Sequence, residues 1–121
     1  MEDRRKFFRF DSPVNIRYAS QRNKRKWKTL TKNISREGFS LSSERRLQEE
    51  DMLKLEFDIP NDKTPVFATG MVVWARENKR GRKKSYDAGI RFTNITGTDR
   101  GRILEHAYRK WLDLNNYKVK V

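Results

Sequence analysis

Alternating apolar and polar positions predict that most of this chain forms short β-strands. The alternation of Val14, Ile16 and Tyr18 is typical of a strand with one buried face. In a second strand over residues 27–34, Leu30 and Ile34 are expected to share one face. The remaining strands are expected over residues 39–42, 53–59, 66–76 and 88–92. Six short strands at this spacing are typical of an antiparallel barrel.

Glycine-containing and basic segments predict the connections between these strands. Residues 35–38 are expected to form a tight turn, because Gly38 can adopt positive φ without a steric penalty. Gly70 indicates a bulge or bend in the strand over residues 66–76. Residues 77–85 are expected to form a basic hairpin loop, whose charge is compatible with solubility alone, with nucleic-acid binding or with an acidic protein partner.

The last part of the chain changes to a helical period. Ile103, Ala107, Trp111 and Leu114 recur at helical spacing, which predicts an amphipathic helix. Thr98 is a suitable residue for the start of this helix. Its apolar face is expected to cover one opening or edge of the barrel. The sequence therefore predicts an all-β dominated fold, a six-stranded antiparallel β-barrel with a C-terminal α-helix.

Composition narrows the functional classes. The chain has 121 residues, enough for one domain, and its 29 Lys and Arg against 16 Asp and Glu give a formal net charge of +13, which favours an anionic ligand. It has no Cys and one His, which excludes disulfides, Cys-based zinc sites and thiol catalysis. No apolar run approaches the roughly 20 residues of a membrane span, and the start of the chain does not resemble a signal peptide. We therefore expect a cytoplasmic binding protein without catalytic activity.

Two short motifs combine groups suited to a guanine nucleotide. Arg5 and Arg9 form an Arg-x-x-x-Arg pair before the first strand, and Asn33, Ser35 and Gly38 form an Asn-x-Ser-x-x-Gly turn between the second and third strands. A guanidinium group binds phosphate or the O6/N7 edge of guanine through paired hydrogen bonds, and its flat face stacks on a purine. The Asn amide both donates and accepts hydrogen bonds, and the Ser hydroxyl can do either. An arginine pair that faces this turn can therefore clamp a guanine nucleotide.

The two motifs, in this order, resemble those of the PilZ domain family, whose members are bacterial receptors for the second messenger cyclic di-GMP. Weaker similarities lie at residues 72–74 and 88–92, so that the resemblance covers nearly the whole chain. It implies one domain, in which a flexible arm of residues 1–12 carries the arginine motif and residues 13–121 form the barrel and helix. It also implies a receptor that signals to a partner protein, with no cofactor or metal beside the ligand.

The resemblance also implies a role for each motif residue. Arg5 and Arg9 would stack on the guanines of cyclic di-GMP and hydrogen-bond its phosphates. Asn33 and Ser35 would hydrogen-bond a guanine or phosphate from the barrel surface, and Gly38 would keep the turn open.

Two further arginines are candidates for the same site. Arg4 directly precedes the arginine motif, and an arginine at this position resembles family members that bind a stacked pair of ligand molecules. Arg36 lies inside the turn and is an additional candidate.

Ligand binding would neutralise the arm and fold it onto the barrel. The alternative function is that of a small basic barrel that binds RNA or DNA through its charged faces.

Overall fold

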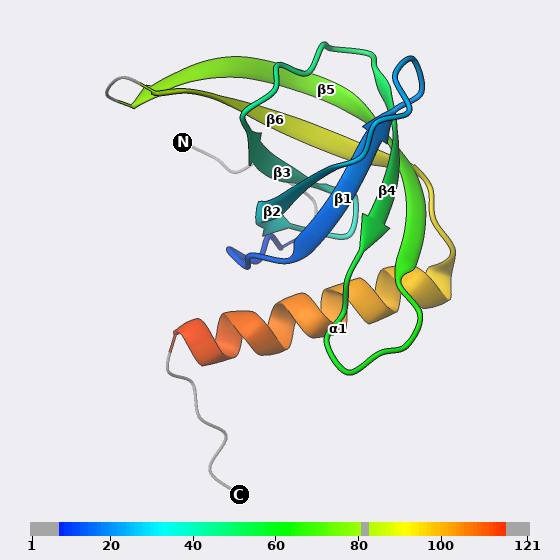
Figure 1. The fold of residues 1–121 in the computed structure, drawn as a ribbon. Coiled ribbons are helices and arrows are strands. Elements are labelled where there is room, and N and C mark those ends of the chain that lie inside the picture. Colours follow the sequence, from blue (N-terminus) through cyan, green and yellow to red (C-terminus); the bar gives the residue numbers. More distant parts are fainter. Residues whose placement is uncertain (1–7, 81–82, 116–121) are drawn as a thin grey trace, which may run out of the picture.

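The structure is a computed structural model that describes residues 8–80 and 83–115, and it contains a closed barrel of six strands with one helix (Figure 1). Around the barrel the strands follow the order β1-β2-β3-β6-β5-β4, and all neighbours are antiparallel. This confirms the predicted fold. The elements are β1 (Asn15–Ser20), β2 (Trp27–Ile34), β3 (Gly38–Ser43), β4 (Met52–Phe57), β5 (Val66–Arg80), β6 (Lys83–Asn94) and α1 (Gly97–Leu114).

The barrel is filled by the apolar residues that alternate along each strand. Phe39, Phe57 and Phe92 meet inside it, with ring centroids 5.3 to 6.0 Å apart. Phe39 and Phe57 are fully buried, and a large apolar side chain buried in this way stabilises a fold by roughly 1.5–3 kcal/mol. The alternation seen in the sequence is therefore the pattern that forms this core.

Helix α1 lies across one end of the barrel (Figure 1) and closes it. Ile103 and Ala107 are buried and join the barrel core, as their spacing predicts. The prediction that the helix starts at Thr98 is wrong, because the Thr96 side chain accepts a hydrogen bond from the Asp99 N–H and caps the helix two residues earlier. Among the described residues, no helix is long and apolar enough to cross a membrane.

The expectation that Leu30 and Ile34 share one face of β2 is wrong. Ile34 is fully buried, whereas Leu30 is 46% exposed. The register between β2 and β3 shifts between Thr31 and Asn33, where the strand bulges. A bulge adds one residue to one strand and so reverses which side chains point inward.

Strands β5 and β6 form a ribbon that extends well beyond the barrel (Figure 1). The sequence predicts a loop over residues 77–85, but the strands remain paired as far as Arg80 opposite Lys83. The sequence pattern did not predict that the strands continue through this segment, because its side chains are polar. A ribbon outside the core needs no apolar face. The irregularity predicted at Gly70 is confirmed as a register shift between Thr69 and Gly70.

Candidate ligand-binding site

The Asn-x-Ser-x-x-Gly motif lies at the turn between β2 and β3. The Ser35 N–H donates a 2.8 Å hydrogen bond to the Gly38 carbonyl oxygen, which closes the turn. The Ser35 hydroxyl accepts a 3.3 Å hydrogen bond from the Glu37 N–H, and Ser35 is only 2% exposed. Asn33 is half-buried and Arg36 is exposed. In this arrangement Ser35 shapes the turn, while Asn33 and Arg36 face outward from it.

Gly38 is needed for the close packing of two strands, and not for a positive φ as its place in the sequence predicts. Its φ lies outside the left-handed region, and its backbone pairs with Arg91 of β6. A Cβ atom at position 38 would lie 1.9 Å from the carbonyl oxygen of Ile90. A backbone oxygen inside a strand cannot move away cheaply, so any side chain here would push β3 and β6 apart.

The second arginine of the arm already contacts the turn. The Arg9 Nη1 donates a 2.7 Å hydrogen bond to the Asn33 Oδ1. The backbones of Phe10 and Ile34 form an antiparallel bridge, with N–H to oxygen hydrogen bonds of 2.8 and 2.9 Å, which holds Arg9 beside β2. The structure thus brings together one residue from each predicted motif. The positions of Arg4 and Arg5 lie outside the described residues.

Two phenylalanines on either side of Arg9 attach the arm to α1. The ring centroid of Phe8 lies 5.8 Å from that of Trp111, and the centroid of Phe10 lies 5.6 and 5.9 Å from those of Tyr108 and Trp111. The two contacts with Trp111 are edge-to-face, a geometry that contributes about 0.5–1.5 kcal/mol for each pair beyond burial. The segment that carries Arg9 is therefore packed against both β2 and α1. The arm boundary at residue 12 stays a prediction.

Sequence reasoning missed a polar network centred on Asp87 of β6, on the outer face of the same sheet. The buried Asp87 carboxylate accepts hydrogen bonds from the Ser42 hydroxyl at 2.5 Å, the Lys32 ammonium at 3.3 Å and the Asn78 amide at 3.2 Å. Burial by itself would raise the pKa of the Asp87 carboxyl, but these hydrogen bonds outweigh it and hold the pKa below its ordinary value. The partners come from three other strands, so no local pattern in the sequence could have revealed the network.

An exposed tryptophan lies next to this network. Trp74 of β5 is 39% exposed and packs over Gly89, where an added Cβ would lie 2.0 Å from the indole Nε1. The Arg76 guanidinium lies 5.3 Å from the Trp74 ring centroid and 3.7 Å from the Asp87 carboxylate. The outer face near the turn therefore offers both an aromatic surface and cationic donors.

A groove of about 640 Å³ lies on another face of the barrel, over β1 and β4. Its lining includes Arg17, Ala19, Lys54 and Phe67 and none of the predicted ligand-binding residues. Within residues 8–80 and 83–115, no group of three or more His, Asp or Glu side chains is placed to hold a metal ion. The described residues of the two motifs therefore lie at the turn, away from this groove.

Comparison with known proteins gives structural relatives at low sequence identity. The PilZ domain of YcgR from Escherichia coli, solved with c-di-GMP, matches with a TM-score of 0.73 at 18% identity, over 94% of this chain and 98% of that one. The inhibitor of motility MotI from Bacillus subtilis matches with a TM-score of 0.71 at 18% identity, over 93% of this chain and 53% of that one. MrkH from K. pneumonia matches with a TM-score of 0.74 at 17% identity, over 98% of this chain and 54% of that one. The chain thus spans about half the length of MotI and MrkH.

The sequence itself gives a family assignment. No curated protein sequence matches the chain. The family model for the PilZ domain matches residues 3–109, which include both motifs and all six strands. Because this match covers most of the chain and the barrel has the fold of solved PilZ proteins, the chain belongs to the PilZ domain family.

Proposed function

We propose that this chain is a receptor for cyclic di-GMP, which it binds between the N-terminal arm and the β2–β3 turn. The observation that carries the proposal is the 2.7 Å hydrogen bond between Arg9 and Asn33, because it joins the two predicted motifs in one place. Membership of the PilZ family supports the same ligand. So do the structures of the YcgR domain, MrkH and PlzA from Borreliella burgdorferi, each solved with c-di-GMP.

The chemistry of the site suits a ligand with two phosphates and two guanines. The Arg9 guanidinium has five N–H donors and can bind a phosphate or a guanine edge while remaining near Asn33. Arg5 is expected to act in the same way from the same arm, and Arg4 to favour a stacked ligand pair. The exposed Arg36 would add positive charge beside the turn.

Ser35 and Gly38 act in this proposal mainly by holding the turn. The Ser35 hydroxyl is engaged by the Glu37 N–H, and Gly38 allows β3 to approach β6. The ligand would therefore meet the Asn33 amide directly, on a backbone that these two residues keep in shape.

The arm can also transmit the binding event. Arg9 lies between Phe8 and Phe10, whose rings pack on Trp111 of α1. A ligand bound by Arg9 would shift the segment between Phe8 and Phe10 and so change these aromatic contacts. This would change the surface that the arm and α1 offer to a partner protein, an order–disorder type of switch.

Calorimetric titration with cyclic di-GMP tests the binding proposal, with GTP and cyclic GMP as control ligands. We expect micromolar or tighter binding of cyclic di-GMP alone, and a loss of about ten- to a hundredfold in affinity for Arg9→Ala and for Asn33→Ala, since a hydrogen bond to a charged group is worth about 1.5–3 kcal/mol. The control Arg109→Ala removes an exposed α1 arginine that pairs with Glu105, and should leave the affinity unchanged. A folded protein that ignores cyclic di-GMP at micromolar concentrations would overturn the proposal.

Hydrogen exchange tests the switch separately from binding. The amides of Phe10 and Ile34 donate to each other's carbonyl oxygens and report directly on arm docking. We expect their protection to change when saturating cyclic di-GMP is added, while the amides that pair β4 with β5 keep theirs. If cyclic di-GMP binds but the protection of these two amides does not change, the arm is not the signalling element of the receptor.

A further inference from the structure

Like charges face each other at the free end of the β5–β6 ribbon. Lys79 lies directly opposite Lys84. Opposed residues of an antiparallel pair have Cβ atoms about 5 Å apart, and like charges at that distance destabilise the pairing. This pair of lysines therefore opposes the pairing of the two strands that carry it, which points to a function other than stability.

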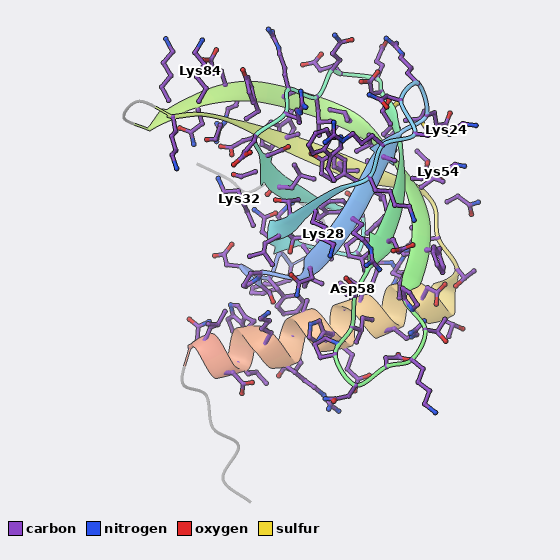
Figure 2. The ribbon with its side chains drawn as sticks, in the orientation of Figure 1. Lys24, Lys28, Lys32, Lys54, Asp58 and Lys84 are labelled. Atoms are coloured by element: carbon purple, nitrogen blue, oxygen red, sulfur yellow. The ribbon has the colours of Figure 1, made fainter. Side chains whose placement is uncertain are left out.

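The position of these cations makes them accessible to a large ligand. The ribbon extends beyond the barrel, and Figure 2 shows Lys84 near its free end. Lys79, Lys83 and Lys84 are all exposed. Because side chains alternate between the two faces of a strand, Lys79 and Lys84 lie on one face of the ribbon and Lys83 lies on the other.

The composition of the ribbon end favours a nucleic acid over a protein partner. The described large hydrophobic side chains that are exposed on this chain all lie elsewhere: Phe8, Leu30, Phe67, Val73, Trp74, Tyr108 and Leu114. The centre of a protein–protein interface is enriched in aromatic residues and depleted in Lys. Interfaces with DNA, by contrast, are polar and strongly positive.

We propose that Lys79, Lys83 and Lys84 of the β5–β6 ribbon bind the phosphate backbone of duplex DNA. A two-stranded ribbon fits the major groove of B-DNA, and cations on both of its faces can then meet the phosphates on both sides of the groove. Phosphates placed between the facing cations would also remove the repulsion that the free ribbon carries. The contact uses none of the predicted cyclic di-GMP residues, so this proposal can be tested independently of the function proposed above.

The fluorescence anisotropy of a labelled DNA duplex of mixed sequence, measured with the full chain over a salt series, tests the proposal. Each phosphate neutralised contributes about 0.9 to the slope of log K against log salt. The double variant Lys79→Gln, Lys84→Gln should therefore bind at least about tenfold more weakly, with a slope smaller by about 2. The control is Lys24→Gln, Lys54→Gln, which removes the same charge from two exposed lysines on the other side of the barrel (Figure 2) and should leave the slope nearly unchanged.

Three results would overturn the proposal. The first is the absence of duplex binding at low salt. The second is an equal loss in both double variants, which would assign binding to net charge alone. The third is displacement of the duplex by polyglutamate at equal charge concentration, which would indicate an acidic protein as the partner. Thermal unfolding of the Lys79→Gln, Lys84→Gln variant checks that it is folded, and its unchanged titration with cyclic di-GMP separates this proposal from the receptor function.

Discussion

Arg9 and Asn33 are 24 residues apart in the sequence, yet the Arg9 Nη1 donates a 2.7 Å hydrogen bond to the Asn33 Oδ1. This contact is also a measurable link between the arm and the barrel. A charge-assisted hydrogen bond that is partly buried should give a coupling free energy of about 1 kcal/mol. A double-mutant cycle of Arg9→Ala and Asn33→Ala, followed by urea unfolding without ligand, measures it. Strictly additive effects would show that the arm does not rest on the turn in solution.

Gly38→Ala should be among the most destabilising single-methyl changes in the barrel. The new Cβ would lie 1.9 Å from the Ile90 carbonyl oxygen, and we expect a loss of about 3 kcal/mol or more in the free energy of unfolding. The matched control is Gly101→Ala in α1, where the new Cβ would have no atom within 4 Å apart from its chain neighbours and the adjacent helix backbone. It should stabilise the protein by about 0.5–1 kcal/mol, because alanine favours a helix. Guanidinium unfolding of both variants is the measurement, and similar effects would contradict the close approach of β3 and β6.

The free energy of unfolding should fall at acidic pH because the Asp87 network loses its negative charge. Its carboxyl has a lowered pKa in the folded protein, so its contribution is complete above the ordinary pKa of 3.8 and is lost as the pH falls through the folded pKa. Asp87→Asn should therefore destabilise the protein by about 1–3 kcal/mol at neutral pH, because Lys32 and Ser42 lose a charged acceptor. The difference from the parent protein should shrink below the folded pKa. Urea unfolding at neutral and strongly acidic pH measures both effects, and a difference that is constant with pH would argue against an ionised Asp87.

The two aromatic residues of the arm should differ in their effect on stability. Phe10 is partly buried against the core and lies near Tyr108 and Trp111, so Phe10→Ala should cost about 2 kcal/mol, less than the 3–5 kcal/mol typical of a fully buried Phe. Phe8 is 64% exposed, and Phe8→Ala should cost less than about 1 kcal/mol. Chemical unfolding ranks the two variants. A larger effect for Phe8 would mean that the arm packs on α1 in a different way.

The parts of the fold that could be predicted are those that local patterns encode. Ile16, Leu55 and Phe57 alternate with polar residues, and a strand with one buried face requires this alternation. Ile103 and Ala107 recur at helical spacing for the corresponding reason in α1. The ends of β5 and β6 could not be found in this way, because a ribbon outside the core has no apolar face to mark it.

The candidate site could be predicted only in part. Its residue types were visible as two motifs, since the chemistry of guanidinium, amide and hydroxyl groups is local to each residue. The contact between Arg9 and Asn33 was not visible, because it depends on the bridge between Phe10 and Ile34. The packing requirement for glycine at position 38 could not be predicted either, since Ile90 approaches it from a strand more than fifty residues later.

For this protein, the linear order of residues was sufficient for the class of fold, the strong positive charge and the set of groups that can meet an anionic nucleotide. Each of these depends on a residue's own chemistry or on its near neighbours. Closure of the barrel then determined which of these groups contact one another. The bulge in β2 turned Leu30 outward, Asp87 gathered partners from three strands, and cations came to face each other at Lys79 and Lys84. Strand register controls all three, and register is set by pairing between distant segments of the chain.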